Sequence, residues 1–136
     1  MTDVVALVDT NVLIDILFDD PTWAGRSLAM LDAVSLEGPL AINDIVYSEL
    51  SVRFPSLEAL DRAVDDAALQ VGATPRAALF MAGKAFGQYR AQGGPRTSIL
   101  PDFFLGAHAA VLEIPLMTRD ARRYRRYFPT LRLLSP

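Results

Sequence analysis

Four acidic residues of this chain stand in surroundings where a carboxylate is costly without a partner. They are Asp9, Glu49, Asp102 and Asp120. Asp9 directly follows the apolar run VVALV, residues 4–8, and Asp120 comes shortly after LMT, residues 116–118. An unpaired charge among apolar groups costs on the order of several kcal/mol. Each of these acids therefore requires a hydrogen-bonding group or a cation beside it.

Glu49 lies within NDIVYSELSVRF, residues 43–54, which has the period of a helix. At about 100° per residue it falls between Ile45 and Val46 on the helical wheel, which predicts that it points toward the core side. The alternative is an ion pair with Arg53 four residues later, which would contribute only about 0.2–0.5 kcal/mol. That pair would explain a position at the edge of the apolar face better than a buried one.

The segment LPDFFLGAHAAVL, residues 100–112, is apolar around its circumference except at Asp102 and His108. This pattern predicts a buried helix. Pro101 suits the first helical position, so Asp102 falls in the first turn, where the helix dipole favours an anion. Dipole compensation is the simpler interpretation of Asp102, but a cation facing it would explain its apolar setting better. His108 lies about 120° away around the helix, and we interpret it as a hydrogen-bonded core histidine rather than a ligand.

Asp9 and Asp120 each have a simpler interpretation as a helix N-cap, a position that Asp fills well. Asp120 could also pair with Arg119 or Arg123. The set as a whole favours a shared site, because carboxylates brought together without a cation would raise one another's pKa values and destabilise the fold.

Hard oxygen ligands favour Mg²⁺ or Mn²⁺ over zinc, and this chain has no cysteine and a single histidine. The acids therefore predict a divalent-metal site in which the partner of Asp9 is the cation. Asn11 and Thr118 are close in sequence to Asp9 and Asp120, and they could hold these ligands in place from behind.

The elements that must position these residues alternate between short apolar strands and helices. Strands are expected at residues 4–8, 40–42, 69–71, 116–118 and 131–134. Helices are expected at residues 11–18, 23–36 after a Thr22 N-cap, about 44–54 after Asn43 or Asp44, 56–68, 75–91, 101–112 and 120–127, with a loop at 93–98. This alternation predicts an α/β fold: a single domain over residues 1–136, with a central, mostly parallel sheet flanked by helices on both faces. Ligands bind beyond the carboxyl ends of such strands, where Asp9 is expected.

Charge is distributed unevenly along the chain. The net charge is −3, yet six of the twelve arginines fall in the last eighteen residues, where Asp120 is the only acid. A basic end on an acidic body favours a polyanionic partner, although a solvated helix face explains it equally well. No basic stretch precedes an apolar segment at the N-terminus, and no apolar run approaches the ~20 residues that cross a bilayer. We therefore expect a soluble, cytoplasmic protein with no membrane partner.

Four motifs, taken in order, resemble the PIN domain and, more narrowly, the VapC-type ribonuclease toxins of bacterial toxin–antitoxin pairs. They are LVDTNVLID (7–15), YSEL (47–50), PDFFLGAHA (101–109) and LMTRDARRYRRYFPTLRLL (116–134). The resemblance covers essentially the whole chain. It implies Mg²⁺- or Mn²⁺-dependent cleavage of RNA, inhibition by a small cognate antitoxin, and a homodimer.

The resemblance also implies roles for individual residues. Asp9 and Asp102 match the most direct metal ligands, and Glu49 and Asp120 complete the acidic quartet, binding water or a second ion. The supporting polar positions match Thr10, Asn11 and Thr118. The arginines beside Asp120 are expected to contact the RNA backbone: Arg119, Arg122, Arg123 and Arg126.

Three alternatives remain open from the sequence. The first keeps the PIN chemistry but assigns it to housekeeping RNA processing. The second is a phosphoryl-transfer domain of the haloacid dehalogenase or response-receiver kind. It would require a second Asp where Asn11 stands, or a late Lys, whereas the only Lys is Lys84 in a predicted mid-chain helix. The third is a protein-binding module that uses the amphipathic stretches 23–36 and 56–68, which ordinary core packing also explains.

Overall fold

Five short strands form a parallel sheet in the computed structural model, which describes residues 3–95 and 100–136. The strands are β1 (Ala6–Val8), β2 (Leu40–Asn43), β3 (Leu69–Gly72), β4 (Leu116–Met117) and β5 (Leu133–Leu134). Their spatial order is β3-β2-β1-β4-β5, and each neighbouring pair is parallel. The predicted α/β fold with a central parallel sheet is confirmed.

Strand β1 lies at the centre of both the sheet and the core. Ala6, Leu7 and Val8 are all 0% exposed. Leu7 is in register with Ala41 of β2 on one side and with Leu116 of β4 on the other. A strand with partners at both edges and helices over both faces leaves no surface for a polar side chain, which explains its continuous apolar run.

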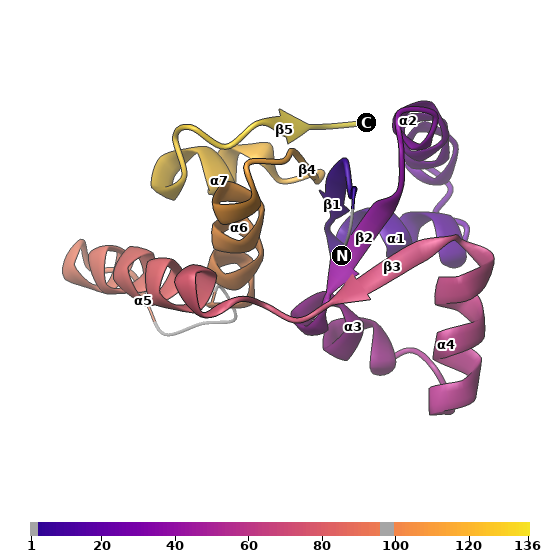
Figure 1. Cartoon of the computed structure of the whole chain (residues 1–136), viewed down its shortest axis with the longest axis horizontal. Helices are drawn as coiled ribbons and strands as arrows, with labels where there is room; N and C mark the ends of the chain where they lie inside the picture. Colours follow the sequence, from indigo (N-terminus) through magenta and orange to yellow (C-terminus); the bar gives the residue numbers. More distant parts are fainter. Residues whose placement is uncertain (1–2, 96–99) are drawn as a thin grey trace.

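Seven helices occur in the described part of the chain: α1 (Thr10–Leu17), α2 (Ala24–Ser35), α3 (Asp44–Ser51), α4 (Leu57–Asp66), α5 (Arg76–Ala91), α6 (Leu100–Leu112) and α7 (Ala121–Tyr127). Figure 1 shows α5, α6 and α7 gathered on one side of the sheet, with α1, α2 and α4 on the other. The chain order explains this division. From β1 to β3 the strands advance in one direction, and the chain then returns past β1 to β4 and β5. Right-handed crossovers in opposite directions cover opposite faces.

The start of α2 differs from the prediction. Thr22 does not cap this helix; instead Asp20 Oδ1 accepts hydrogen bonds from the backbone N–H groups of Thr22 and Trp23, each at 2.9 Å. These bonds also lower the pKa of the Asp20 carboxyl. Asp20 can do this because an Asp carboxylate reaches the backbone N–H groups two and three residues later and closes the turn that precedes Ala24. Part of the predicted loop, residues 96–98, lies outside the described residues.

The direction of the strand connections changes at the carboxyl end of β1, between β1 and β4, and we call this place the crevice. The chain leaves β1 through α1 and α2 to reach β2, whereas β4 on the other side is reached from β3 through α5 and α6. Parallel sheets bind their ligands where the direction of the connections changes in this way. Asp9 follows β1 and Thr118 follows β4, so both side chains belong to this crevice. Within residues 3–95 and 100–136, no helix has both the length and the apolar character needed to span a bilayer.

Candidate active site

Asp9 is the buried centre of the acidic cluster. Its backbone is extended, with φ −74° and ψ 152°, and it forms the N-cap of α1. Asp9 Oδ1 accepts a hydrogen bond from the Thr10 N–H at 2.7 Å. Asp9 Oδ2 accepts from the Thr118 hydroxyl at 2.8 Å, the Tyr124 hydroxyl at 2.9 Å and the Asn11 amide at 3.4 Å. The N-cap interpretation is therefore correct but accounts for only one of the two carboxylate oxygens.

None of these donors carries a positive charge. Burial raises the pKa of Asp9 from 3.8 to about 6, although the hydrogen bonds from Thr118 and Tyr124 act in the opposite direction. The nearby charge of Asp102 adds to the rise. Neither ion pair found in the described residues involves Asp9. Without a cation beside it, the burial of this carboxylate costs free energy.

Tyr124, from α7, joins the two acids predicted to be direct metal ligands. Its hydroxyl lies 2.9 Å from Asp9 Oδ2 and 3.3 Å from Asp102 Oδ1. A phenol has one proton to donate, so it satisfies only one of two ionised carboxylates at a time. Burial and the two neighbouring carboxylates raise the pKa of Tyr124 far above its ordinary value, which keeps that proton in place. When Tyr124 donates to one of these two carboxylates, the other therefore receives no hydrogen bond from it.

The cation that faces Asp102 in this structure is Arg123. Its Nη1 lies 2.6 Å from Asp102 Oδ2, and the side chains are 49% and 19% exposed, respectively. Burial nevertheless raises the pKa of Asp102, because the loss of solvent outweighs the hydrogen bond and charge of Arg123. The sequence assigned Arg123 to RNA and left the partner of Asp102 to a metal. A half-exposed ion pair of this kind is weak, so the guanidinium can exchange Asp102 for another anion at small cost.

Glu49 lies on the rim of the crevice, and the prediction that it points toward the core is wrong, because the residue is exposed. Its Oε1 accepts a hydrogen bond from the Thr10 hydroxyl at 2.8 Å. The alternative pairing with Arg53 is also absent from the described ion pairs, since the Arg53 guanidinium lies 5.0 Å from the Phe18 ring. Partial loss of solvent raises the pKa of Glu49 despite the bond from Thr10, and the charge of Asp102 raises it further.

Asp120 occupies the N-cap position of α7, but its side chain makes no capping hydrogen bond. Asp120 Oδ2 instead accepts from the Asn11 amide at 3.3 Å, and the Asp120 N–H donates to the Thr118 hydroxyl at 3.0 Å. The same Asn11 nitrogen is 3.4 Å from Asp9 Oδ2. Asn11 and Thr118 therefore link Asp9 to Asp120 through hydrogen bonds.

Arg119 points away from the acids, toward α1 and α2. Its Nε lies 3.0 Å from Oδ2 of Asp15, whose side chain is only 1% exposed, although the N–H is not aligned as a hydrogen bond. The Ser27 hydroxyl donates to the same oxygen at 3.0 Å, and the guanidinium lies 5.0 Å from the Trp23 ring. Arg119 thus anchors the segment after β4 to the helices that cover the neighbouring strand.

The other three arginines predicted to contact RNA lie beside Asp120. A hollow of about 430 Å³ is lined by Arg122, Arg123, Arg126, Tyr89, Tyr127 and Asp120, and we call it the Arg–Tyr hollow. The hollow lies between the end of α5 and the start of α7, which are far apart in sequence. The Arg–Tyr hollow therefore adjoins the acids directly.

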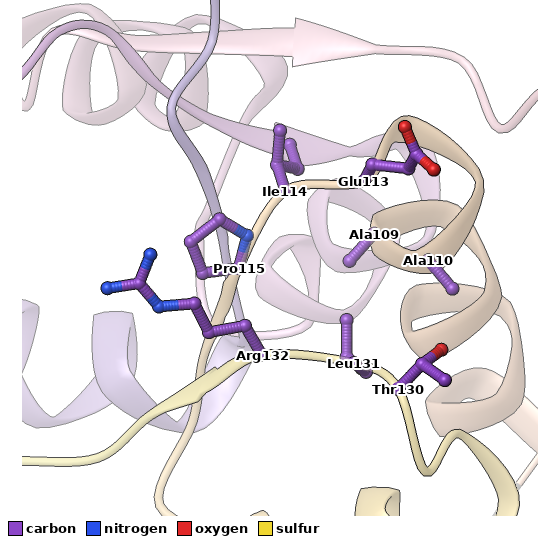
Figure 2. A pocket seen from close by; sticks show the side chains of 8 residues that line it. All are labelled: Ala109, Ala110, Glu113, Ile114, Pro115, Thr130, Leu131 and Arg132. Carbon is purple, nitrogen blue, oxygen red and sulfur yellow. The ribbon is translucent and has the colours of Figure 1, made fainter.

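A second hollow, of about 300 Å³, lies at the other end of α6 (Figure 2). Its walls are formed by Ala109, Ala110, Glu113, Ile114, Pro115, Thr130, Leu131 and Arg132. These residues belong to the last turns of α6 and to the segments that enter β4 and β5. Because Asp102 is in the first turn of α6, this hollow is at the opposite edge of the sheet from the acids.

His108 is buried within α6, as predicted for a core histidine. The Asn43 amide lies 3.3 Å from its Nδ1. An amide NH₂ can only donate, so Nδ1 accepts and His108 is neutral, in agreement with the lowering of its pKa by burial. It takes no part in the acidic cluster.

The acids fit a hard divalent cation by their chemistry, since all four offer carboxylate oxygens. Among the described residues, however, no three acidic or histidine side chains lie close enough to hold one ion in the present arrangement. An ion bound by Asp9 and Asp102 would supply the positive charge that Asp9 lacks among its hydrogen-bond donors. Arg123 would have to release Asp102 to admit it, which a half-exposed side chain can do.

Two residues of this region were not identified from the sequence: Tyr124 and Asp15. Tyr124 is the buried residue of α7. The sequence does indicate that Tyr124 is buried: it is the one aromatic residue between two pairs of arginines, RRYRR, and must face the interior if the helix packs against the core. Asp15 offered no comparable signal, because its partner Arg119 is distant in sequence.

Comparisons with known proteins agree with this fold. A family model of the PIN domain matches residues 6–129. The curated protein sequences contain no match to this chain. Among solved structures, VapBC2 from Rickettsia felis bound to a promoter DNA fragment aligns with TM-score 0.74 and 18% identity, covering 96% of this chain and 98% of that chain. VapBC-1 from nontypeable Haemophilus influenzae gives TM-score 0.72 and 20% identity, with 96% of each chain covered. DNA-bound VapBC from Salmonella typhimurium gives 0.68 and 20%, covering 97% of this chain and 98% of that chain. The similarity to these structures is one of fold, and the family match, which spans most of the chain, establishes that this protein belongs to the PIN domain family.

Proposed function

We propose that this protein is a Mg²⁺- or Mn²⁺-dependent endoribonuclease that acts as the toxin of a toxin–antitoxin pair. The observation that supports it most is the meeting of Asp9 and Asp102 at the single hydroxyl of Tyr124. Thr10 and Asn11 connect Glu49 and Asp120 to the same place. Carboxylates from separate segments thus gather at the carboxyl edge of the sheet, and PIN family membership supports hydrolysis of phosphodiester bonds there.

Asp9 and Asp102 would hold the metal ion. When bound, the ion would activate water and offset the charge that develops on the phosphate. Thr118, Tyr124 and Asn11 fix the orientation of the Asp9 carboxylate through three hydrogen bonds, so this ligand is held in position before any ion arrives.

Glu49 and Asp120 would orient water or bind a second ion. Both are exposed, whereas Asp9 is buried, so they are the acids that solvent and substrate reach first. No side chain has to act as a covalent nucleophile in this scheme. The residues supply charge and position, and the attacking oxygen comes from water.

Arg122 and Arg126 are exposed and lie on the hollow that contains Asp120. We propose that they bind RNA phosphates next to the cut, so affinity would fall as salt rises. Single-stranded or loop RNA is the expected substrate, because its bases and backbone are accessible. Arg119 has no comparable freedom, because Asp15 holds it.

The toxin role rests on the resemblance of the sequence motifs to VapC-type toxins. From this resemblance we also propose that the partner is a small cognate antitoxin, that the protein assembles as a homodimer, and that it acts in the cytoplasm. Housekeeping RNA processing is the second candidate. A short open reading frame overlapping this gene or just upstream of it would favour the toxin, and its absence would favour housekeeping.

A cleavage assay tests the chemistry. Purified protein with Mn²⁺ should cut end-labelled RNA, and Asp9→Asn should abolish cutting because it removes charge without removing volume. Asp32→Asn is the matched control, since Asp32 is an exposed acid on α2, remote from the crevice. Full activity of Asp9→Asn would remove Asp9 from the metal site. Expression with and without the neighbouring gene, followed by mapping of RNA ends, would identify the target.

A further inference from the structure

We propose that the Arg–Tyr hollow is a subsite for one unpaired nucleotide of the RNA, with its base stacked on Tyr89 and its phosphate held by the arginines of α7. This inference rests on the proposed function and adds to it the form of substrate that the site accepts. The hollow measures about 430 Å³, which is within the range of pockets that enclose small organic ligands.

The aromatic side of the hollow is rigid. The Tyr127 ring packs edge-on against Phe103, with centroids 5.1 Å apart, and edge-on against Tyr89 at 6.1 Å. Tyr89 also contacts Phe103 at 5.7 Å and Phe86 at 6.0 Å. Because Phe103 is buried in α6, these contacts tie both tyrosine rings to the core. A ring held in this way can stack with a base without first losing conformational freedom.

A glycine turn holds Tyr89 from the other side. The Gly94 N–H donates to the Tyr89 carbonyl at 2.9 Å. A Cβ added at Gly94 would lie only 2.5 Å from the Tyr89 ring, so the backbone approaches the ring as closely as a glycine allows. Tyr89 is nevertheless only partly buried and forms part of the wall of the hollow. Both its position and its partial exposure suit a stacking platform.

Hydrogen bonds hold the basic side of the hollow in place as well. Gln92 Oε1 accepts from Arg126 Nη2 at 2.9 Å and from the Tyr127 hydroxyl at 3.3 Å. Gln92 thereby links the end of α5 to α7 and uses only part of the Arg126 guanidinium. Three arginines and one carboxylate, that of Asp120, line the hollow. Arg123 is already paired with Asp102, but Arg122 and Arg126 still outnumber Asp120, so the net charge favours an anion.

These features together select a nucleotide. Phosphate matches the guanidinium groups, and the planar face of a base matches the tyrosine ring. Only an unpaired base can offer its face, because in a duplex both faces are covered by neighbouring base pairs. Asp120 belongs both to the hollow and to the acidic cluster through Asn11, so the nucleotide would lie directly beside the bond that is cut. A peptide with acidic and aromatic side chains is the competing ligand.

Binding of a short single-stranded RNA that contains 2-aminopurine tests the proposal, with EDTA present to prevent cutting. Stacking quenches the fluorescence of this base. Tyr89→Leu keeps most of the volume and removes the aromatic face, so we expect about tenfold weaker binding and loss of quenching. Tyr89→Phe should retain both. The matched control is Phe80→Leu: Phe80 is 70% exposed on the same helix and about 180° from Tyr89 around it.

A crosslinking experiment on the unmodified protein gives an independent readout, should Tyr89→Leu fail to fold. RNA carrying 4-thiouridine should crosslink to the peptides that contain Tyr89 or Tyr127, and the same RNA annealed to its complement should not. Crosslinks confined to other peptides would overturn the proposal.

The subsite and the proposed function can fail separately. Equal RNA affinity and quenching in wild type, Tyr89→Leu and Phe80→Leu, with Asp9-dependent cutting intact, would overturn the subsite and leave the nuclease in place. Absence of both RNA binding and Mn²⁺-dependent cutting in the wild type would overturn both. Displacement of the RNA from wild type by an acidic, tyrosine-containing peptide at lower concentration than by unlabelled RNA would identify the hollow as a peptide site and overturn the nucleotide assignment.

Discussion

Replacing Asp9 by Asn should stabilise the metal-free protein at high pH, although it destroys the proposed metal site. The pKa of Asp9 rises from 3.8 to about 6 on folding, which corresponds to roughly 3 kcal/mol between its charged and neutral forms. A raised carboxyl pKa means that the folded protein binds the proton more tightly than the unfolded chain. The contribution to stability is therefore complete below about pH 4, falls as the pH rises toward about 6, and stays lost above it.

The neutral amide avoids this loss but does not accept all the hydrogen bonds of the carboxylate. Its NH₂ faces hydroxyl donors from Thr118 and Tyr124, which must turn to accept instead. Leaving one such bond unmade costs about 1–2 kcal/mol. We therefore expect Asp9→Asn to be about 1–2 kcal/mol more stable than wild type at about pH 8 in EDTA, and less stable than wild type by about the same amount at about pH 4.

Urea unfolding in EDTA at several pH values measures this directly. The quantity of interest is the difference in unfolding free energy between Asp9→Asn and wild type as a function of pH, with Asp32→Asn as control. Saturating Mn²⁺ should reverse the order at about pH 8, because only the wild type gains binding energy. A difference that does not change with pH would refute the reasoning, since it would mean that burial imposes no cost on the Asp9 charge.

Three further predictions concern helix packing, a buried ion pair and RNA binding. Gly106→Ala should destabilise the fold by about 1–3 kcal/mol in thermal unfolding, because a Cβ there would lie 2.6 Å from the Phe128 ring. Gly83→Ala is the matched control: a Cβ added at Gly83 would meet nothing within 4 Å, so this change should stabilise the fold by up to about 1 kcal/mol. Asp15→Asn should cost about 2 kcal/mol in urea unfolding, because it breaks a largely buried ion pair, and an unchanged midpoint would show that this pair contributes nothing. Arg122→Ala combined with Arg126→Ala should weaken RNA binding and reduce the slope of log affinity against log salt by about 2, whereas an unchanged slope would exclude both side chains from the phosphate contacts.

Strands and helices were predictable where their burial requires a recognisable pattern of apolar residues in the sequence. Within the apolar run at residues 4–8, residues 6–8 form β1, because a central strand excludes polar side chains from both faces. The segment 100–112 became the buried α6 for the same reason. The spatial order β3-β2-β1-β4-β5 depends on which strands pair, and no property of an isolated strand encodes it.

The sequence predicts four candidate acids, but it could not predict their contacts. Wheel geometry assigned Glu49 to the core side because it considers one helix alone, whereas α3 ends at the rim and leaves this residue exposed. Four arginines near Asp120 appeared equivalent in sequence, yet Asp15 holds Arg119 and Asp102 holds Arg123. Such pairings join residues far apart in the chain, and only the tertiary structure determines them.

The two competing interpretations of Asp9, helix cap and metal ligand, turn out to describe the same geometry. To cap α1, the carboxylate must follow the strand directly and have an extended backbone, which turns Oδ1 onto the Thr10 N–H. The same conformation directs Oδ2 into the crevice between β1 and β4, toward Thr118 and Tyr124. The cap therefore positions the oxygen that we propose as a metal ligand. A substitution that preserves capping but lacks the second oxygen, such as Asp9→Ser, should keep α1 intact while abolishing Mn²⁺ binding. Loss of α1 in that variant, seen as reduced helicity by circular dichroism, would show that Oδ2 and its donors hold the helix as much as the cap does.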